Sequence, residues 1–216
     1  MNTLRNAVIV TVLIVAYLLL FYSPLRLFII PVVYLTTFLH EFGHAATALI
    51  TGGHVYSIHI GADGSGLTTT SGGSNALTLM GGYIGSAIFG NVLLRLSFTR
   101  AAKMTIAVLA CAMVFSSLIW FSDLFTTGLL IGFSIGLYVL SRTPVAPVVL
   151  QFLGAASIIY IIQDYNVGPT GDLAIWQQTV SALPPPFVNM FIWLGLALVI
   201  TYLNVKSMLT DYKYST

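Results

Sequence analysis

Long apolar stretches alternate with short polar breaks along the whole chain. A helix that crosses a bilayer needs about 20 mostly apolar residues, because the hydrocarbon core is roughly 30 Å thick and each residue rises about 1.5 Å. Seven segments approach this length, at about 7–22, 25–50, 76–98, 103–121, 124–140, 145–162 and 187–205. The pattern therefore predicts an all-α polytopic membrane protein with about six to seven transmembrane helices.

Residues 51–75 break the helical pattern between the second and third segments. They contain seven glycines, and β-forming residues occur at 55–60 and 67–70, on either side of the turn residues 62–66. This arrangement is typical of two strands joined by a tight turn. We therefore expect a small Gly-rich β-hairpin that lies in water, in a cavity or against protein, because its edge backbone cannot face lipid unpaired.

Residues 163–186 form a second irregular region. They include Asn166 and Pro169 in a polar stretch, followed by Asp172 at the start of a run that is too short to span a bilayer. We expect an irregular or re-entrant segment here, with a short helix capped by Asp172. Since no long-period repeat or soluble domain interrupts the pattern, residues 1–216 are interpreted as one membrane-embedded domain.

Composition supports the membrane assignment and narrows the chemistry. Hydrophobic residues make up 57% of the chain and charged residues 6%, whereas a soluble domain carries about 25% charged residues. The formal charge of +2 is spread thinly and no nucleotide-binding loop is present, which argues against nucleic-acid and nucleotide partners. A single cysteine excludes intramolecular disulfides and Cys-cluster metal sites. Four His, five Asp and one Glu remain as acids, bases and hard metal ligands.

The only glutamate lies in His40-Glu41-Phe42-Gly43-His44, an H-E-x-x-H motif within the second hydrophobic segment. Residues four apart on a helix lie one turn apart on the same face, so both imidazoles can reach one ion. Glu41 lies on the adjoining flank, where it can reach a metal-bound water without being a ligand. Because ionisable groups at mid-membrane are costly, the motif favours a functional site over a polar contact between helices. It predicts a zinc site with Glu41 as general base.

A catalytic zinc usually has three protein ligands and a water, so one more ligand must come from elsewhere in the chain. No second Glu exists, and Thr47 and Ile50 occupy the positions where an extended H-E-x-x-H-x-x-G-x-x-H motif has its Gly and last His. Asp164 ends a long apolar helix and Asp172 begins the short one, and both remain candidates for the third ligand.

The other acids and histidines have simpler explanations. His54 and His59 are interpreted as polar residues of the hairpin, and Asp63 as a turn residue before glycine. Asp123 is expected to cap a helix in a short connection, and Asp211 lies in a polar tail. These residues are weaker ligand candidates than Asp164 and Asp172.

At these motifs the chain resembles the site-2 protease family of intramembrane zinc metalloproteases, in particular its compact B-type branch without a PDZ domain. The resemblance rests on H-E-F-G-H-A at 40–45, on the Gly-rich hairpin that runs from 51–55 to 66–70, and on Gly81-Gly82-Tyr83-Ile84-Gly85-Ser86 with Gly90. It implies that a distant Asp supplies the third zinc ligand, from an Asn-x-x-Pro loop that leads into an Asp-Gly at a helix start. Residues 166–169 resemble that loop and Asp172 follows, although Leu173 replaces the Gly. The resemblance favours Asp172, with Asp164 as its rival.

The resemblance further implies an enzyme, a zinc metalloendopeptidase with one zinc per chain, held by His40, His44 and Asp172. Such an enzyme hydrolyses peptide bonds in or near transmembrane segments, so its partners are the lipid bilayer and the helices of membrane-protein substrates. An integral membrane location is expected, in the inner membrane of a prokaryotic cell. Two other classes stay open: a zinc- or proton-coupled transporter, and a non-catalytic protease relative that binds membrane helices.

Two indications of membrane orientation disagree. The first hydrophobic segment lacks a small-residue cleavage site and is expected to be retained as a signal anchor. With seven spans, Arg5 lies opposite the other seven Lys and Arg, which predicts an N-terminus outside and a C-terminus inside. That count places the hairpin outside, whereas the family resemblance implies a hairpin on the cytosolic side.

Overall fold

The computed structural model describes residues 3–164, 171–180 and 185–213. The predicted loop residues Asn166 and Pro169 lie outside the described residues. The elements follow one another as α1 (Thr3–Phe21), the 3₁₀ helix η1 (Pro24–Ile29), α2 (Ile30–Ile50), β1 (His54–Ile60), β2 (Gly66–Ser71), α3 (Asn75–Ser97), α4 (Ala102–Ile119), α5 (Leu124–Ser141), α6 (Ala146–Ile158), α7 (Tyr160–Asp164), α8 (Asp172–Thr179) and α9 (Pro186–Lys213).

The helical membrane architecture predicted from the hydrophobic segments is confirmed. Among the described residues, five helical stretches are long and apolar enough to cross a bilayer: Pro24–Ile50, Asn75–Ser97, Ala102–Ile119, Leu124–Ser141 and Pro186–Met208. Two shorter apolar stretches, Thr11–Phe21 and Ala146–Ile158, correspond to the remaining predicted segments. The predicted segment at 145–162 differs in detail, because its helix is interrupted at Ile159 and divides into α6 and α7.

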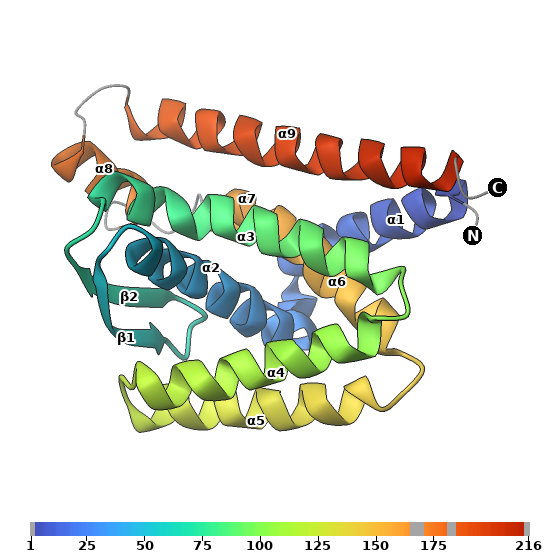
Figure 1. The fold of residues 1–216 in the computed structure, drawn as a ribbon, viewed down its shortest axis with the longest axis horizontal. Helices are drawn as coiled ribbons and strands as arrows, with labels where there is room; N and C mark the ends of the chain where they lie inside the picture. The colour runs from blue at the N-terminus through green and yellow to red at the C-terminus, as the bar shows by residue number, and fades with distance from the viewer. Residues whose placement is uncertain (1–2, 165–170, 181–184, 214–216) are drawn as a thin grey trace.

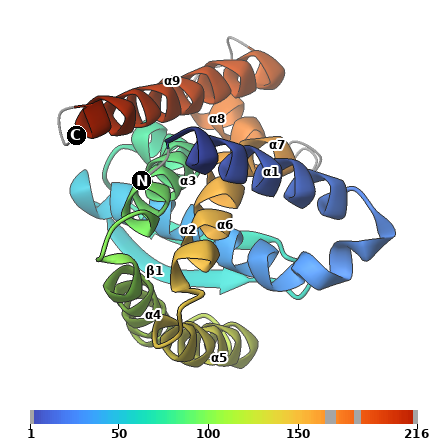
Figure 2. The same ribbon diagram turned by 90° about the vertical axis from the view of Figure 1, so that its right-hand side faces the viewer.

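The helices form a layered bundle with α3 near its centre. Figures 1 and 2 show α9 on one side of α3 and the α4–α5 pair on the opposite side of the molecule. The largest group of buried apolar side chains joins α2, α4, α5 and α6, and its fully buried members include Phe38, Ile106, Met113, Leu130 and Leu150. Its buried members from α2 are Leu35, Phe38 and Leu39, which directly precede the H-E-x-x-H motif.

Glycines set the short distances between α3 and its neighbours. A Cβ atom at Gly43 would overlap the carbonyl of Gly81, and a Cβ atom at Gly85 would lie 3.0 Å from the Cα of Gly43. Gly90 and Gly154 face each other in the same way between α3 and α6, where added Cβ atoms would lie 2.6 and 2.7 Å from the opposing carbonyl oxygens. Small residues allow helix backbones to approach closely in lipid. The glycines of α3 therefore fix its position against α2 and α6.

The predicted hairpin is confirmed as an antiparallel pair of strands. β1 pairs with β2 in a register that places Ile58 opposite Thr68, with an irregularity between Val55 and Ser57. At the turn, Gly64 has a φ of +90°, a conformation that favours glycine. The Asp63 carboxylate accepts hydrogen bonds from the amide and the hydroxyl of Ser65, at 3.0 and 2.6 Å, as expected for a turn residue.

The hairpin is held between α2 and the α4–α5 connection. On the β1 side, the Ile58 amide donates to the Trp120 carbonyl at 3.0 Å, and the Ile60 amide donates to the Thr126 hydroxyl at 3.1 Å. On the α2 side, the Thr37 hydroxyl donates to the Gly64 carbonyl at 2.8 Å. These contacts satisfy backbone groups that lipid would leave unpaired. They place β2 directly over the H-E-x-x-H motif.

Candidate metal centre

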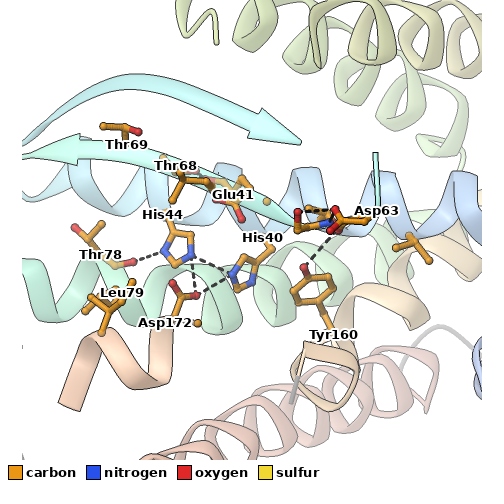
Figure 3. A pocket seen from close by; sticks show the side chains of 18 of the residues that line it. His40, Glu41, His44, Asp63, Thr68, Thr69, Thr78, Leu79, Tyr160 and Asp172 are labelled. Atoms are coloured by element: carbon orange, nitrogen blue, oxygen red, sulfur yellow. Dashed lines mark hydrogen bonds and ion pairs between the residues drawn. The ribbon is translucent and has the colours of Figure 1, made fainter. Parts of the chain in front are cut away.

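Three potential ligand atoms converge between α2 and α8. The Nε2 atoms of His40 and His44 lie 3.0 Å apart, and the Oδ2 atom of Asp172 lies 3.0 Å from each of them. Figure 3 shows the two imidazoles, one helical turn apart on α2, facing the Asp172 carboxylate. Both histidines are buried, with exposed fractions of 3% and 6%. These three side chains form the one group of three or more such residues within ligand distance that the described residues contain.

Asp172 does not cap its helix, and this part of the prediction is wrong. The N-cap of α8 is Gly171, and no side chain bonds to the first amides of the helix; Asp172 is the first helical residue. Its carboxylate turns toward the imidazoles instead. Burial alone would raise the pKa of the Asp172 carboxyl, but the facing imidazoles of His44 and His40 hold it well below its ordinary value. The ionised carboxylate is the form that binds a metal.

The three atoms fit a zinc ion in size and in chemistry. Zinc binds nitrogen and oxygen at about 2.0–2.2 Å, which separates tetrahedral ligand atoms by about 3.3 Å. The triangle of 3.0 Å edges needs to widen by only a few tenths of an ångström to accept the ion. Two neutral imidazoles and one carboxylate also form a ligand set that suits zinc.

The hydrogen bonds around the histidines fix which ring nitrogen faces the cluster. The Nδ1 atom of His44 lies 2.7 Å from the backbone carbonyl of Thr78, which can only accept a hydrogen bond. His44 therefore carries a proton on Nδ1, which leaves Nε2 as the ring nitrogen that would bind a metal. The buried Nδ1 atom of His40 has no hydrogen-bond partner within the described residues, and the rings of Tyr83 and Tyr160 flank its imidazole.

Gly82 provides the space for both imidazoles. A Cβ atom there would overlap His44 and would lie 2.5 Å from the Cε1 atom of His40. Gly82 lies on the turn of α3 that faces the motif, and any side chain at this position would displace the rings. The glycine is thus part of the site, although it offers no ligand atom.

Glu41 lies beside the cluster without joining it. Its side chain is buried, with an exposed fraction of 4%, and its Oε2 atom accepts a hydrogen bond of 2.6 Å from the Thr68 hydroxyl of β2. The same hydroxyl lies 3.0 Å from the Glu41 carbonyl. A Cβ atom at Gly66 would overlap the Glu41 carboxylate, so β2 is seated on this residue. The hairpin therefore fixes the carboxylate that the sequence indicates as a general base.

The remaining sequence candidates do not join the cluster. His59 pairs with Asp123 at 2.7 Å, and His54 contacts Tyr56 edge to face. Asp123 caps α5 as predicted, because its carboxylate accepts from the Thr126 amide at 2.9 Å. Hydrogen bonds from Thr126, supported by His59, lower the pKa of the Asp123 carboxyl below its ordinary value.

The rival third ligand, Asp164, is the last residue of α7. Its side chain lies outside the described part of the structure, so its relation to the cluster stays untested. The described geometry therefore brings one predicted candidate, Asp172, to the two histidines.

A cavity of about 740 Å³ opens onto the cluster and onto Glu41. Residues 64–70 of the hairpin form one wall, and Asp172 with Ile175 of α8 contributes to another. Tyr160, the first residue of α7, lines the cavity, and its hydroxyl is 3.4 Å from that of Thr37. The cavity is large enough for several residues of an extended peptide to reach the three ligand atoms.

Comparison with known families decides the class of the chain. A profile of Peptidase M50B-like proteins matches residues 8–203. The chain belongs to this peptidase family. Membership confirms the resemblance to site-2 proteases and makes the chain a membrane metalloprotease by family. The search found no match among curated proteins and none among solved structures.

Sequence reasoning did not find Thr68, Thr78 or Gly82 as parts of the peptidase site. The two-residue period of β2 could have indicated Thr68, because it shares a face with Gly66. Thr78 contributes its backbone carbonyl. Every residue type has this group, so the sequence does not indicate the position. Gly82 lies within a glycine-rich stretch of the sequence, but spacing alone does not distinguish a glycine that faces a histidine from one that packs against a helix.

Proposed function

We propose that the peptidase hydrolyses peptide bonds in or near transmembrane segments of membrane proteins, with one zinc per chain held by His40, His44 and Asp172. The observation that carries this proposal is the convergence of the three ligand atoms beside Glu41 in one cavity within the helical bundle. Family membership supports the peptidase chemistry, and the ligand set supports zinc. An inner-membrane location in a prokaryotic cell is part of the proposal.

The roles of the side chains follow from their positions. When bound, zinc supplies a Lewis acid that polarises a carbonyl and makes water more acidic. Glu41 accepts a proton from the attacking water and returns it to the leaving amine. Thr68 holds the carboxylate of Glu41 toward the cavity, through the hydrogen bond at 2.6 Å. The Thr78 carbonyl keeps His44 in the tautomer that leaves Nε2 free.

The second strand of the hairpin supplies a means of holding the substrate. A helical substrate conceals its carbonyls in backbone hydrogen bonds, so cleavage needs a locally unwound segment. β1 and β2 form a two-stranded sheet within the described residues, and residues 66–70 of β2 line the cavity. An unwound segment can add to the free edge of β2 as a further strand. The edge would then present the scissile bond to the cluster.

The test combines metal content and cleavage in one purified protein. We would reconstitute the chain in liposomes with a panel of fluorescent single-span helices, each with a central Gly-Pro break that exposes backbone carbonyls. The wild type is expected to hold about one zinc and to cleave members of the panel. Glu41→Gln is expected to keep its zinc and to lose cleavage by about 10²–10⁴-fold.

Each other outcome contradicts a named part of the proposal. A zinc-loaded wild type that binds the helices and cleaves none of them indicates a non-catalytic relative. Zinc flux or proton-coupled flux that persists in Glu41→Gln indicates a transporter. Loss of zinc with Asp164→Ala, and its retention with Asp172→Ala, would identify Asp164 as the third ligand.

A further inference from the structure

The site cavity extends well beyond the metal cluster. The α2 residues that line it lie at positions 33, 37, 40, 41 and 44, which share one face of the helix. Figure 3 shows His44, His40 and Tyr160 one after another along this direction. Beyond the start of α2 the cavity is lined by Arg26 of η1 and by Phe21, the last residue of α1. The cavity therefore has the three ligand atoms in one part and an arginine in another.

The hairpin follows α2 along the same cavity. Near the start of α2, the Gly64 carbonyl accepts from the Thr37 hydroxyl at 2.8 Å. One turn further, the Thr68 hydroxyl donates to the Glu41 carboxylate at 2.6 Å. β2 thus runs in the same direction as α2, from the side of Arg26 toward the metal cluster. A substrate strand added to β2 would lead from the cluster back toward Arg26.

Arg26 carries a charge without a counter-charge. It is the only lysine or arginine among the described residues that line the cavity, and no ion pair of the described residues involves it. Its guanidinium carbon lies 4.8 Å from the centroid of the Phe21 ring. Ser23 caps η1 and Pro24 is its first residue, so the backbone that carries Arg26 has a defined conformation. The guanidinium is therefore held at the cavity wall.

The carboxylates that line the same cavity already have partners. Glu41 accepts from Thr68, and Asp172 faces the two imidazoles. Asp63 accepts from the amide and the hydroxyl of Ser65. The unmatched charge of the described cavity wall is thus positive. A guanidinium offers paired N–H donors that match the two oxygens of a carboxylate.

We propose that Arg26 is a specificity-determining residue, which binds the carboxylate of an Asp or Glu side chain in the substrate. Arg26 precedes His40 by 14 positions, so helical rise separates the two by at most about 24 Å. An extended strand rises about 3.3 Å per residue, which places the acidic side chain about five to seven residues from the scissile bond. The inference rests on the proposed function, because it names a substrate class for that site.

The direction of the substrate follows from strand pairing. Antiparallel pairing is slightly more stable per residue than parallel pairing. A strand antiparallel to β2 would pass from the Thr70 end to the Gly66 end, and Gly66 lies on the side of Arg26. The acidic residue is therefore expected on the C-terminal flank of the scissile bond.

The test compares paired substrates in liposomes. Each single-span helix would carry either Glu or Gln at one position, from two to nine residues away on either flank of the scissile bond. At one position about five to seven residues away on the C-terminal flank, we expect kcat/KM to be about 3–10-fold higher for Glu than for Gln. The same preference on the N-terminal flank would overturn the antiparallel arrangement. No preference at any position would overturn the role of Arg26.

Variants of the arginine test whether it causes the preference. Arg26→Gln should cleave the Glu and Gln substrates at equal rates, and Arg26→Glu should favour Lys over Gln at the same position. A gained preference for Lys cannot arise from misfolding. Arg142→Gln is the matched control, because the Arg142 guanidinium also lies 4.8 Å from an aromatic ring, that of Tyr138, but outside this cavity. It should keep the preference for Glu, whereas a Glu preference that persists in Arg26→Gln would overturn the proposal.

A binding measurement separates this inference from the proposed hydrolysis. In the zinc-loaded Glu41→Gln protein, fluorescence anisotropy of the labelled substrates should show about 3–10-fold tighter binding of the Glu version. The additional change Arg26→Gln should abolish this difference. Such binding in a protein whose wild type cleaves nothing would support recognition by Arg26 and contradict hydrolysis. Cleavage by the wild type with equal affinities and equal rates would do the opposite.

Discussion

Two clusters in this molecule join histidine to aspartate, and they have different consequences. His40, His44 and Asp172 meet within the bundle at 3.0 Å from one another, and the side chain of the aspartate is 17% exposed. His59 and Asp123 meet at 2.7 Å at the edge of the hairpin, where their side chains are 45% and 35% exposed. The closer pair is the more solvated one.

The difference lies in what else the carboxylate binds. Asp123 accepts hydrogen bonds from the Thr126 amide, the Thr126 hydroxyl and the Ser122 hydroxyl, so its lone pairs are occupied by a helix cap. The Asp172 carboxylate does not cap a helix, and both of its described contacts are with imidazole nitrogens. The buried cluster thus offers three potential ligand atoms in which no backbone amide competes for the carboxylate, whereas the Asp123 carboxylate is already occupied by a helix cap.

The largest expected effect comes from removing each aspartate in turn. Asp172→Ala should lower zinc affinity on the order of 100-fold or more, because it removes one of the three proposed ligands. Asp123→Ala should leave one zinc per chain. The zinc content per chain, measured in detergent-purified protein after dialysis against a weak chelator, distinguishes the two variants. Equal zinc loss in both variants would remove the contrast between the clusters.

A methyl group at Gly82 should come next in magnitude. Gly82→Ala places a Cβ atom against both imidazoles, and such overpacking costs about 1–3 kcal/mol. We expect zinc affinity to fall by about tenfold. Gly132→Ala is the matched control on α5, since a Cβ atom there meets nothing within 4 Å. Equal zinc affinity in the two variants would show that Gly82 is not needed to seat the histidines.

The hydrogen bond from Thr68 should affect turnover more than binding. A hydrogen bond to a charged group contributes about 1.5–3 kcal/mol, so Thr68→Val should lower kcat by about 10–100-fold while zinc and KM stay close to wild type. Thr68→Ser keeps the hydroxyl and should restore most of the rate. If Ser and Val variants lose activity equally, the methyl group rather than the hydroxyl of Thr68 matters.

The smallest effect is expected at Asp123, on stability alone. Loss of a helix N-cap costs about 1 kcal/mol, so Asp123→Ala should lower the thermal midpoint in detergent by a few degrees, whereas Asp123→Asn keeps a capping oxygen and loses only the charge. The folded pKa of Asp123 lies below its ordinary value. Its contribution is therefore complete above the unfolded pKa of about 3.9 and declines as the pH falls below it. The gap between wild type and Asp123→Asn should narrow in that acidic range and stay constant at neutral pH.

Local spacing made one half of the candidate site predictable. His40, Glu41 and His44 lie on one helix, so the period of the helix alone brings the imidazoles together. Asp172 could not be chosen over Asp164 from spacing, because its approach depends on how α8 packs against α3 and α9. The misassigned cap has the same origin, since a sequence does not show that a carboxylate is drawn to a histidine on another helix.

The fold was likewise predictable where it depends on local patterns and not where it depends on packing between distant elements. Hydrophobic length predicted the spanning helices, and alternation predicted the hairpin, because both patterns are local. The packing of α1 against α6 was not predictable from segment counting, since it depends on contacts between distant parts of the chain. Tyr17 is fully buried and contacts Phe152 of α6, which ties α1 to the bundle at an angle that length does not reveal.

The distance along the chain between the converging groups affects how the protein is made. His40 and Asp172 are separated by 132 residues, so the ribosome completes the motif helix long before it reaches α8. During that interval the nascent chain already carries both imidazoles and the glutamate, but not the aspartate that closes the cluster. Assembly of the three-residue cluster is thus postponed until nearly the whole chain has been synthesised.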